Sequence, residues 1–344
     1  MKKAPANIIL TRPDGIGDVV FILPIAKKLK DIFPNIKLAI LGSAYTKALA
    51  DACEYIDDFI YVEDFLTKDI TICGKKPEAL LHVKTTKQLA MRAKELKIPL
   101  RIGTSSRLYH WYTCNRLVRL SRKKSDLHEA QLNLKLLKAF GLNKVFSLND
   151  ISDWYGLTKV EKLLPENEYI IQKDKYNVII HPKSKGNARE WSIDHFLTLI
   201  KSLDTNNYNI ILSGTENEKQ FLEPIFKEAG NKITDITGKL SLSQFMSLIK
   251  QSDCVIANST GPVHLGAALD INVLALFPPL KPKHPGRWAP VGHKVEVFVL
   301  PEFCQDCRLT PNDCHCINAI QPQEVKASLD KLMNVKLQKQ NSLV

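Results

Sequence analysis

Short apolar stretches of strand character alternate with longer stretches of helical character along most of this 344-residue chain. The first half begins with a strand over residues 7–10 and a helix over 18–32, where apolar side chains recur at helical spacing. The pattern restarts with a strand over 177–180 and a helix over 192–203. Strands that alternate with helices predict a parallel sheet with helices on both faces. We therefore expect an α/β protein with two Rossmann-like parallel-sheet domains.

The length of the chain and a break in its composition support this division. A chain of 344 residues is longer than one hydrophobic core usually organises. The stretch over 149–174 is polar, contains Pro165 and shows no clear long element. We expect an N-terminal domain over 1–172, a C-terminal domain over 173–325 and a helical tail over 326–344. Two such domains facing each other form a cleft, and ligands bind at the carboxyl ends of the strands.

Charge and apolar content narrow the class of protein. The net charge of +12 indicates anionic partners, such as a phosphorylated substrate, nucleic acid or an acidic membrane face. No helix-turn-helix or RNA-binding signature accompanies the charge, so we expect no nucleic acid. No apolar run approaches the ~20 residues that span a bilayer. The first apolar run stops at Thr11, so we interpret it as a strand rather than a signal peptide and expect a cytoplasmic protein.

The most informative stretch joins a strand over 254–257 to a helix through a short polar turn. Ser259 or Thr260 can cap this helix through a hydroxyl, and Gly261 lets a ligand approach the backbone. N–H groups at the positive end of the helix dipole form a seat for phosphate, and His264 can donate a hydrogen bond to an anion. The alternative is an ordinary capped helix that follows a strand.

Two further loops between strands and helices carry charged side chains. The loop His181–Trp191 holds Lys183, Lys185 and Arg189, and a guanidinium can pair with two phosphate oxygens at once. A solvated basic loop is the alternative, although the tryptophan favours a packed one. Glu218 lies in the first turn of a later helix, where a carboxylate can accept both ribose hydroxyls of a nucleotide. Its alternative role is that of a helix-capping acid.

The loop after the first strand holds two carboxylates, Asp14 and Asp18, beside Gly15-Ile-Gly17. The glycines match only part of the dinucleotide fingerprint, because Val20 stands where the third glycine belongs. Asp18 lies in the first turn of a helix, whose dipole favours the ionised form. It therefore suits a general base that takes a proton from a substrate hydroxyl. Alternatively, Asp18 is simply a carboxylate at a helix N-terminus.

Together these loops resemble the motifs of glycosyltransferase family 9, the ADP-heptose:lipopolysaccharide heptosyltransferases. The resemblance is carried by Gly17-Asp18 followed by Pro24, Arg189-Glu-Trp191, Gly214 with Glu218, and Asn258-Ser-Thr-Gly-Pro-Val-His-Leu265. Their order and spacing match over about residues 7 to 330. The resemblance implies a GT-B fold and an inverting, metal-independent transfer of a heptose-type sugar. The donor would be a nucleotide sugar of the ADP-heptose type, and the acceptor a lipopolysaccharide core or a related saccharide.

The resemblance also implies roles for single residues. Asp18 would be the catalytic base. The donor-binding residues would be Lys185, Arg189, Glu218, Ser259, Thr260, Gly261 and His264, with the diphosphate held at Arg189 and the Thr260-Gly261 turn and the ribose at Glu218. The chain has no Asp-X-Asp triplet to carry a metal, so cations and helix N-termini must neutralise the leaving diphosphate. We expect no cofactor for catalysis.

The chain departs from the family at two of these positions. Ser259 stands where the family usually has Asp, which removes a charge close to the donor sugar. Arg189 stands where the family usually has Lys. These departures make the identity of the donor the least determined part of the expectation.

A run of aromatic and basic residues in the first half suits an anionic saccharide, because aromatic rings stack on sugars and cations attract phosphates. In the family this half takes the acceptor, an anionic lipid-linked saccharide, which implies transient peripheral contact with the inner membrane surface. We expect acceptor contacts from Asp14, Lys84, Arg107, Tyr109 and Trp111. The alternative for the run is a basic amphipathic helix with solvated charges.

Four of the eight cysteines crowd together near the C-terminus, as Cys304-Gln-Asp-Cys307 and Cys314-His-Cys316. Four thiolates in this pattern suit a tetrahedral zinc or iron site that leaves no open position, and hence a structural metal. The alternatives are reduced core cysteines or one disulfide.

Two other classes of protein remain open on the residues alone. An NAD-type oxidoreductase would use Gly15 and Gly17, and a failure to bind nicotinamide cofactors would exclude it. A non-catalytic module that binds a sugar nucleotide or nucleic acid would make Ser259 a mark of lost activity. Transfer or hydrolysis of any nucleotide sugar would separate an enzyme from such a module.

Overall fold

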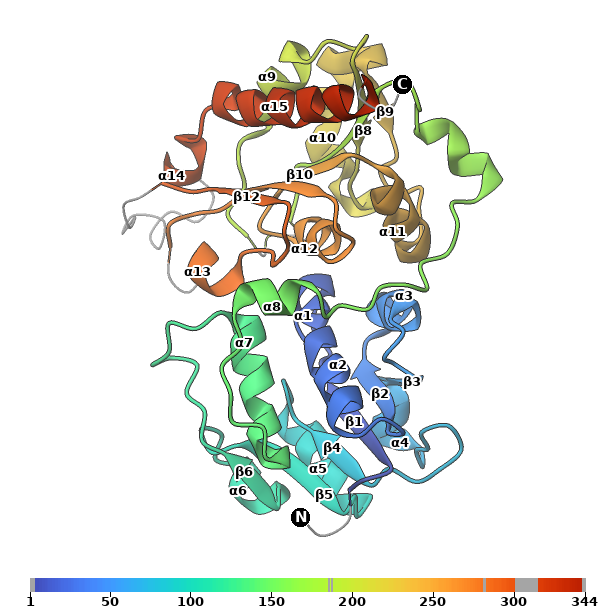
Figure 1. Ribbon diagram of the computed structural model, residues 1–344, viewed down its shortest axis with the longest axis vertical. Coiled ribbons are helices and arrows are strands. Elements are labelled where there is room, and N and C mark those ends of the chain that lie inside the picture. Colours follow the sequence, from blue (N-terminus) through green and yellow to red (C-terminus); the bar gives the residue numbers. More distant parts are fainter. Residues whose placement is uncertain (1–3, 185, 187, 281–282, 301–314, 342–344) are drawn as a thin grey trace. The chain divides into compact units, whose positions relative to one another are not determined.

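The computed structural model describes residues 4–184, 186, 188–280, 283–300 and 315–341 (Figure 1). The chain separates into two compact units, Met1–Glu161 and Lys162–Val344. The division falls inside the polar stretch over 149–174. Both units consist of alternating strands and helices, and every strand pairing in their sheets is parallel, which confirms the prediction of an α/β class.

The first unit contains a six-stranded sheet in the order β3-β2-β1-β4-β5-β6. The strands are β1 (Asn7–Thr11), β2 (Lys37–Gly42), β3 (Asp58–Tyr61), β4 (Ala79–Leu81), β5 (Leu100–Thr104) and β6 (Arg116–Val118). The α-helices are α1 (Ile16–Val20), α2 (Leu23–Ile32), α3 (Lys47–Ala52), α4 (Val62–Thr67), α5 (Lys87–Glu95), α6 (His110–Thr113), α7 (Glu129–Leu134) and α8 (Leu148–Ser152). All five residues of β1 are buried, as a central strand covered on both faces requires.

The second unit repeats this plan with the sheet order β12-β11-β10-β7-β8-β9. Its strands are β7 (Tyr176–His181), β8 (Tyr208–Leu212), β9 (Ile233–Asp235), β10 (Cys254–Asn258), β11 (Asn272–Leu276) and β12 (Val295–Phe298). Its α-helices are α9 (Ile193–Ser202), α10 (Lys219–Ala229), α11 (Leu242–Gln251), α12 (Gly261–Ala268), α13 (Pro285–Trp288), α14 (His315–Asn318) and α15 (Pro322–Asn341). Among the described helices of both units, none combines the length and the apolar character that crossing a membrane requires.

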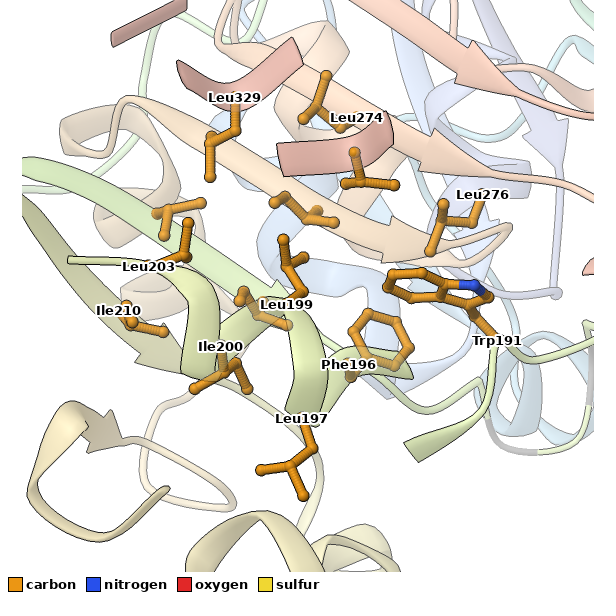
Figure 2. Packing of buried hydrophobic residues seen from close by; sticks show 14 of the residues in the cluster. Trp191, Phe196, Leu197, Leu199, Ile200, Leu203, Ile210, Leu274, Leu276 and Leu329 are labelled. Atoms are coloured by element: carbon orange, nitrogen blue, oxygen red, sulfur yellow. The ribbon is translucent and has the colours of Figure 1, made fainter. Parts of the chain in front are cut away.

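The core of the second unit gathers around Trp191, which is only 1% exposed and packs edge-on against Phe196 (Figure 2). The indole N–H donates to the carbonyl of Ile320 at 2.8 Å. Val325 and Leu329 of α15 belong to the same buried cluster. The C-terminal helix is therefore part of the second unit's core.

Strand order reverses once in each sheet. In the first unit the chain leaves β1 toward β2 and β3 and later returns to place β4 on the other side of β1. In the second unit β7 and β10 have the same relation. Loops that leave adjacent strands in opposite directions open a crevice at the carboxyl ends of those strands, which is where open α/β sheets bind ligands. Each unit therefore has one topologically favoured binding position.

One expected helix, and one considered as an alternative, take a different form. The helix expected over 18–32 is broken into α1 and α2, because Pro24 cannot donate the backbone hydrogen bond that would continue α1 and its ring clashes with the preceding turn. The basic run from Arg107 to Lys124 is not an amphipathic helix. It forms the four-residue helix α6 and the edge strand β6.

Candidate active site

Asp18 lies at the carboxyl edge of the first sheet, in the first turn of α1. Gly15, the N-cap residue of α1, provides no side-chain cap, and Asp18 is the acidic residue of that turn. Its carboxylate forms an ion pair with the guanidinium of Arg12, and its side chain is 29% exposed. The carboxylate is thus held by a fixed cation and still accessible to solvent.

Arg12 is the centre of a buried charge network. It follows β1 directly and is only 2% exposed. Its Nε lies 3.2 Å from the Asp14 carboxylate, and its Nη1 lies 3.8 Å from Oε1 of Glu129. Glu129, also 2% exposed, receives a further hydrogen bond of 2.9 Å from Nε of Arg122. Buried charges are stable only with such partners, so this network fixes the side chain of Arg12.

Sequence reasoning missed Arg12, Arg122 and Glu129 as site residues. The available signal was a charged residue directly after a buried strand, because that position lies at the carboxyl edge of a parallel sheet. Arg122 and Glu129 had no such signal, since six residues of loop separate them and only the fold brings them to the end of β1.

Lys84 is brought to the same edge by the loop after β4. Its backbone N–H donates to the carbonyl of Thr11 at 3.1 Å, and the Thr11 hydroxyl donates to the Lys84 carbonyl at 2.7 Å. The Lys84 ammonium lies 3.5 Å from a carboxylate oxygen of Asp14. The structure therefore brings three of the residues expected at the site, Asp14, Asp18 and Lys84, around the switch point between β1 and β4.

Arg107, Tyr109 and Trp111 lie in and before α6, on the next loop along this edge. The Tyr109 hydroxyl donates to the carbonyl of Thr85 at 3.0 Å, next to Lys84. Burial raises the pKa of Tyr109. Arg107 is exposed and Trp111 is 64% exposed, so both side chains are accessible to solvent.

In the second unit, Asn258 joins the two loops at the switch point between β7 and β10. The Asn258 side chain is fully buried, accepts the backbone N–H of Trp191 at 2.9 Å, and donates to the carbonyl of Pro182 at 2.6 Å. At Pro182 and Trp191 this loop is therefore packed against the end of β10. This agrees with the expectation of a packed loop and excludes a loosely solvated one.

The cations of this loop have different surroundings. Lys183 forms an ion pair with Glu190, whose other oxygen accepts the backbone N–H of Ser184 at 2.8 Å. Arg189 lies near Lys283, and burial, together with the positive charge of Arg189, lowers the pKa of Lys283. Two neighbouring, partly buried cations favour an anionic ligand. Lys283 was missed because it lies far from the loop in sequence, and Lys185 lies outside the described residues.

Helix α12 begins at the same switch point with Thr260 as its N-cap residue. No side-chain hydrogen bond caps this helix, so the expectation that Ser259 or Thr260 caps it through a hydroxyl is wrong. The backbone of Thr260 is extended, with φ −145° and ψ 175°. His264 in the first turns of the helix is 6% exposed, whereas Ser259, Thr260 and Gly261 are partly exposed. The backbone N–H groups at the start of α12, which no side chain caps, can therefore donate hydrogen bonds to a bound anion.

Glu218 follows β8 and is 5% exposed. Its Oε2 accepts the backbone N–H of Thr215 at 2.7 Å and the Thr215 hydroxyl at 2.8 Å. It thus has the capping role that sequence reasoning considered as the alternative, and this role orients the carboxylate. At the end of neighbouring β7, Nδ1 of His181 lies 3.0 Å from the Ser213 hydroxyl, a contact that sequence reasoning did not anticipate.

Three of the four expected metal ligands, Cys304, Cys307 and Cys314, lie outside the described residues. Cys316 is described, in α14, where it is partly buried and packs against the core of the second unit. The described residues alone contain no group of three or more side chains that could hold a metal ion.

A family model described as glycosyltransferase family 9 (heptosyltransferase) matches residues 71–317. The chain is 22% identical to lipooligosaccharide heptosyltransferase 2 of Campylobacter jejuni over 335 residues, which cover 95% of this chain and 99% of the relative. It is 21% identical to the lipopolysaccharide core heptosyltransferase OpsX of Haemophilus influenzae over 318 residues, 86% of each chain.

Solved structures show the same fold at lower identity. Escherichia coli ADP-heptose lps heptosyltransferase II matches with a TM-score of 0.75 and 18% identity, covering 96% of this chain and 99% of that one. The E. coli heptosyltransferase WaaC with ADP matches with a TM-score of 0.70 and 15% identity, covering 95% and 99%. The iron-containing dodecameric glycosyltransferase TibC from enterotoxigenic E. coli matches with a TM-score of 0.60 and 14% identity, covering 97% and 77%.

Two parallel α/β units with the same strand order, together with these structural matches, define the GT-B fold and confirm the predicted fold class. The family model matches well over half of the chain, and the chain belongs to glycosyltransferase family 9. It is therefore a glycosyltransferase rather than a nicotinamide-dependent oxidoreductase.

Proposed function

We propose that this enzyme transfers a heptose-type sugar from an ADP-linked donor to a lipopolysaccharide core or a related saccharide. The observation that carries the proposal is the start of α12. This helix has no side-chain cap, and Asn258 joins it to the loop that holds Arg189. Helix N–H groups and a guanidinium together suit a diphosphate. The names of two structural neighbours, which include ADP-heptose and ADP, support an adenine nucleotide.

The proposed division of labour follows the two units. The second unit binds the donor through Arg189, Ser259, Thr260, Gly261 and His264, with Lys185 as a further contact in the loop. Glu218 contacts the ribose, and its hydrogen bonds to Thr215 fix the direction of its carboxylate. The first unit binds the acceptor through Asp14, Lys84, Arg107, Tyr109 and Trp111.

In the proposed mechanism, Asp18 takes a proton from an acceptor hydroxyl. The hydroxyl oxygen forms a bond to the anomeric carbon of the donor sugar while the bond from that carbon to the diphosphate oxygen breaks, which inverts the configuration. The released nucleoside diphosphate carries the negative charge away from the sugar. Arg189 and the N-terminus of α12 neutralise that charge, so the step needs no metal.

The proposed acceptor is anionic and lipid-linked, because Lys84 and the basic residues that follow β5 are available at the acceptor edge. A lipid-linked acceptor places the enzyme at the cytoplasmic face of the inner membrane as a peripheral protein. The family relatives that are named for lipopolysaccharide or lipooligosaccharide support an acceptor of this class.

We expect Asp18→Ala to reduce transfer at least about a hundredfold, the range of general-base contributions, with little change in donor affinity. Transfer is measured as ADP release from ADP-heptose with acceptor present, and donor affinity as the thermal shift caused by ADP. Glu161→Ala, at the end of the first unit, is the matched control. Near-normal turnover in Asp18→Ala would remove its assigned role, and a larger thermal shift with UDP or GDP than with ADP would contradict the donor.

We also propose that Cys304, Cys307, Cys314 and Cys316 hold a structural zinc or iron ion. The four clustered thiols support it, and so does the existence of an iron-containing structural neighbour. Elemental analysis of protein purified without chelator should find about one zinc or iron per chain. Cys304→Ser should lose it, whereas Cys73→Ser, an exposed cysteine in the first unit, should retain it. Metal-free wild-type protein would overturn this proposal.

A further inference from the structure

The helical turn that contains α6 presents its two faces to different surroundings. Backbone hydrogen bonds from His110 to Arg107 and from Trp111 to Leu108, at 3.0 and 3.1 Å, wind residues 107–114 into a helical turn. The inward face holds His110, which is 2% exposed and accepts the backbone N–H of Thr104 at 2.9 Å. The turn is therefore fixed to the end of β5.

The outward face of the same turn is apolar. Leu108 is 86% exposed, Trp111 is 64% exposed and Tyr112 is 48% exposed. These residues have the spacing i, i+3 and i+4, which places them on one side of a helical turn. The indole N–H of Trp111 donates to the carbonyl of Ser105 at 3.1 Å, so the polar edge of the ring is bound to the protein. Elsewhere in the described chain, no five consecutive residues contain three exposed large apolar side chains.

Cations flank this apolar face along the sequence. Residues 96–125 contain eight Lys and Arg and no Asp or Glu. The exposed cations of this stretch are Lys97, Arg107, Arg116, Arg119, Lys123 and Lys124, and none of them forms an ion pair within the described residues. An exposed apolar group on a stretch of chain that carries only positive charges is complementary to a bilayer with anionic headgroups, where aromatic side chains lie at the interface and Lys and Arg contact phosphate.

We propose that Leu108, Trp111 and Tyr112, with the flanking cations, form a membrane-docking surface for anionic phospholipid, which we call the α6 surface. It deepens the proposed function, because it lies beside the acceptor residue Tyr109 and would present the site to a lipid-linked acceptor. A soluble anionic saccharide would use the cations and stack on the aromatic rings, but it would not account for Leu108, which is 86% exposed on a fixed turn.

The first test uses phospholipid vesicles that contain no saccharide acceptor. The wild-type enzyme should sediment with mixed phosphatidylglycerol and phosphatidylcholine vesicles and much less with phosphatidylcholine alone, and added salt should weaken the binding. Leu108→Ser/Tyr112→Ser should lower the partition coefficient about tenfold. The matched control Leu164→Ser/Tyr169→Ser changes two exposed apolar residues of the second unit and should bind like the wild type.

A second pair of variants tests the charges. The first variant removes three cations near the α6 surface, Arg119→Gln/Lys123→Gln/Lys124→Gln, and should bind anionic vesicles about tenfold more weakly than the wild type. The control removes three exposed lysines elsewhere in the first unit, Lys75→Gln/Lys76→Gln/Lys94→Gln, and should bind like the wild type. Circular dichroism melting checks that each variant is folded. Failure of the wild type to bind anionic vesicles, or equal binding by the α6-surface and control variants, would overturn the proposal.

Activity measurements separate this proposal from the proposed function. Leu108→Ser/Tyr112→Ser should keep wild-type transfer to a water-soluble, delipidated acceptor and lose activity on the same acceptor embedded in vesicles. Loss of transfer to the soluble acceptor together with unchanged vesicle binding would make the α6 surface a saccharide site instead. Absence of transfer by the wild-type enzyme would contradict the proposed function and leave the vesicle result intact.

Discussion

At the scale of single residues, the burial of charge is the informative feature of the first unit. Arg12 and Glu129 are each 2% exposed, whereas Asp18 is 29% exposed. The buried guanidinium thus orients a carboxylate that remains open to a substrate hydroxyl. A guanidinium suits this position because its fork can serve several carboxylates at once. We therefore regard Arg12 as the positioning residue for Asp18.

We expect Arg12→Met to lower the free energy of unfolding by about 3 kcal/mol, because it leaves the buried Glu129 with one cation fewer. Arg12→Met/Glu129→Met should recover part of this loss, since it removes both buried charges. Urea denaturation of the wild type, Arg12→Met, Glu129→Met and the double variant measures the coupling. Losses that simply add in the double variant would contradict an energetic link between Arg12 and Glu129.

The role of Arg12 can also be tested through kcat and KM. Arg12→Lys keeps the positive charge but loses the planar guanidinium group. Because Asp18 would then be displaced, kcat should fall by about a hundredfold while the KM for the donor stays unchanged. A purely structural role for Arg12 would lower the melting temperature without this separation of kcat from KM.

At the scale of elements, helix α12 is held in place by close packing at a glycine. A Cβ atom at Gly266 would lie 2.8 Å from Cγ2 of Val273 in β11 and 3.3 Å from Cγ2 of Val255 in β10. Both valines are fully buried, so neither can move aside easily. The absence of a side chain at position 266 therefore sets how closely α12 and its N-terminus approach the sheet.

We expect Gly266→Ala to lower the free energy of unfolding by about 1–3 kcal/mol, although alanine favours helix by about 1 kcal/mol, because the overpacking outweighs the propensity. It should also weaken ADP binding, since the N-terminus of α12 is displaced. Thermal melts with and without ADP measure both effects. Ala268→Ser, at the partly exposed end of α12, is the control. A Gly266→Ala protein more stable than the wild type would show that the contact relaxes at little cost.

At the scale of the whole molecule, buried histidines make stability depend on pH. His82 follows β4, is 1% exposed and stacks on His110 with ring centroids 5.3 Å apart. In the described parts of the chain, neither ring nitrogen of His82 has a hydrogen-bond partner. Burial, reinforced by the charges of His110 and Arg101, lowers the pKa of His82 from 6.5 to about 3. Burial also lowers the pKa of His110.

The sign of the pH effect follows from these shifts. Between pH 6.5 and about 3 the unfolded chain binds a proton at His82 that the folded chain does not, so stability falls as the pH falls. The expected slope from His82 is about 1.4 kcal/mol per pH unit below 6.5. His82→Leu should remove this contribution and be neutral or stabilising at pH 8, because it deletes an unsatisfied polar group. Urea denaturation between pH 5 and 8 measures how the free energy of unfolding depends on pH. His293→Leu, at an exposed histidine, is the control. Equal slopes of this free energy against pH in His82→Leu and the wild type would contradict the role of His82.

Local sequence patterns determined the α/β class, most strands and the loops that carry the candidate site. The fully buried strands β1, β7 and β10 could be predicted from their mainly apolar residues, because a central parallel strand is buried on both faces. The three-residue edge strand β6 was not, since a short, half-exposed segment with Arg116 lacks such a pattern. Helix capping was predicted wrongly at α12, because a hydroxyl at the right position only permits a hydrogen bond.

The tertiary structure alone decided which charges meet. Asp18 could be predicted as a helix-terminal carboxylate, but its link through Arg12 to Glu129 joins residues more than a hundred positions apart. Likewise, Arg189 could be predicted as a phosphate ligand, but the proximity of Lys283 could not. The physical reason is that periodicity and turn chemistry act over a few residues, whereas burial and ion pairing depend on strand order. The reversal of strand order in each sheet is what collects these side chains at one edge.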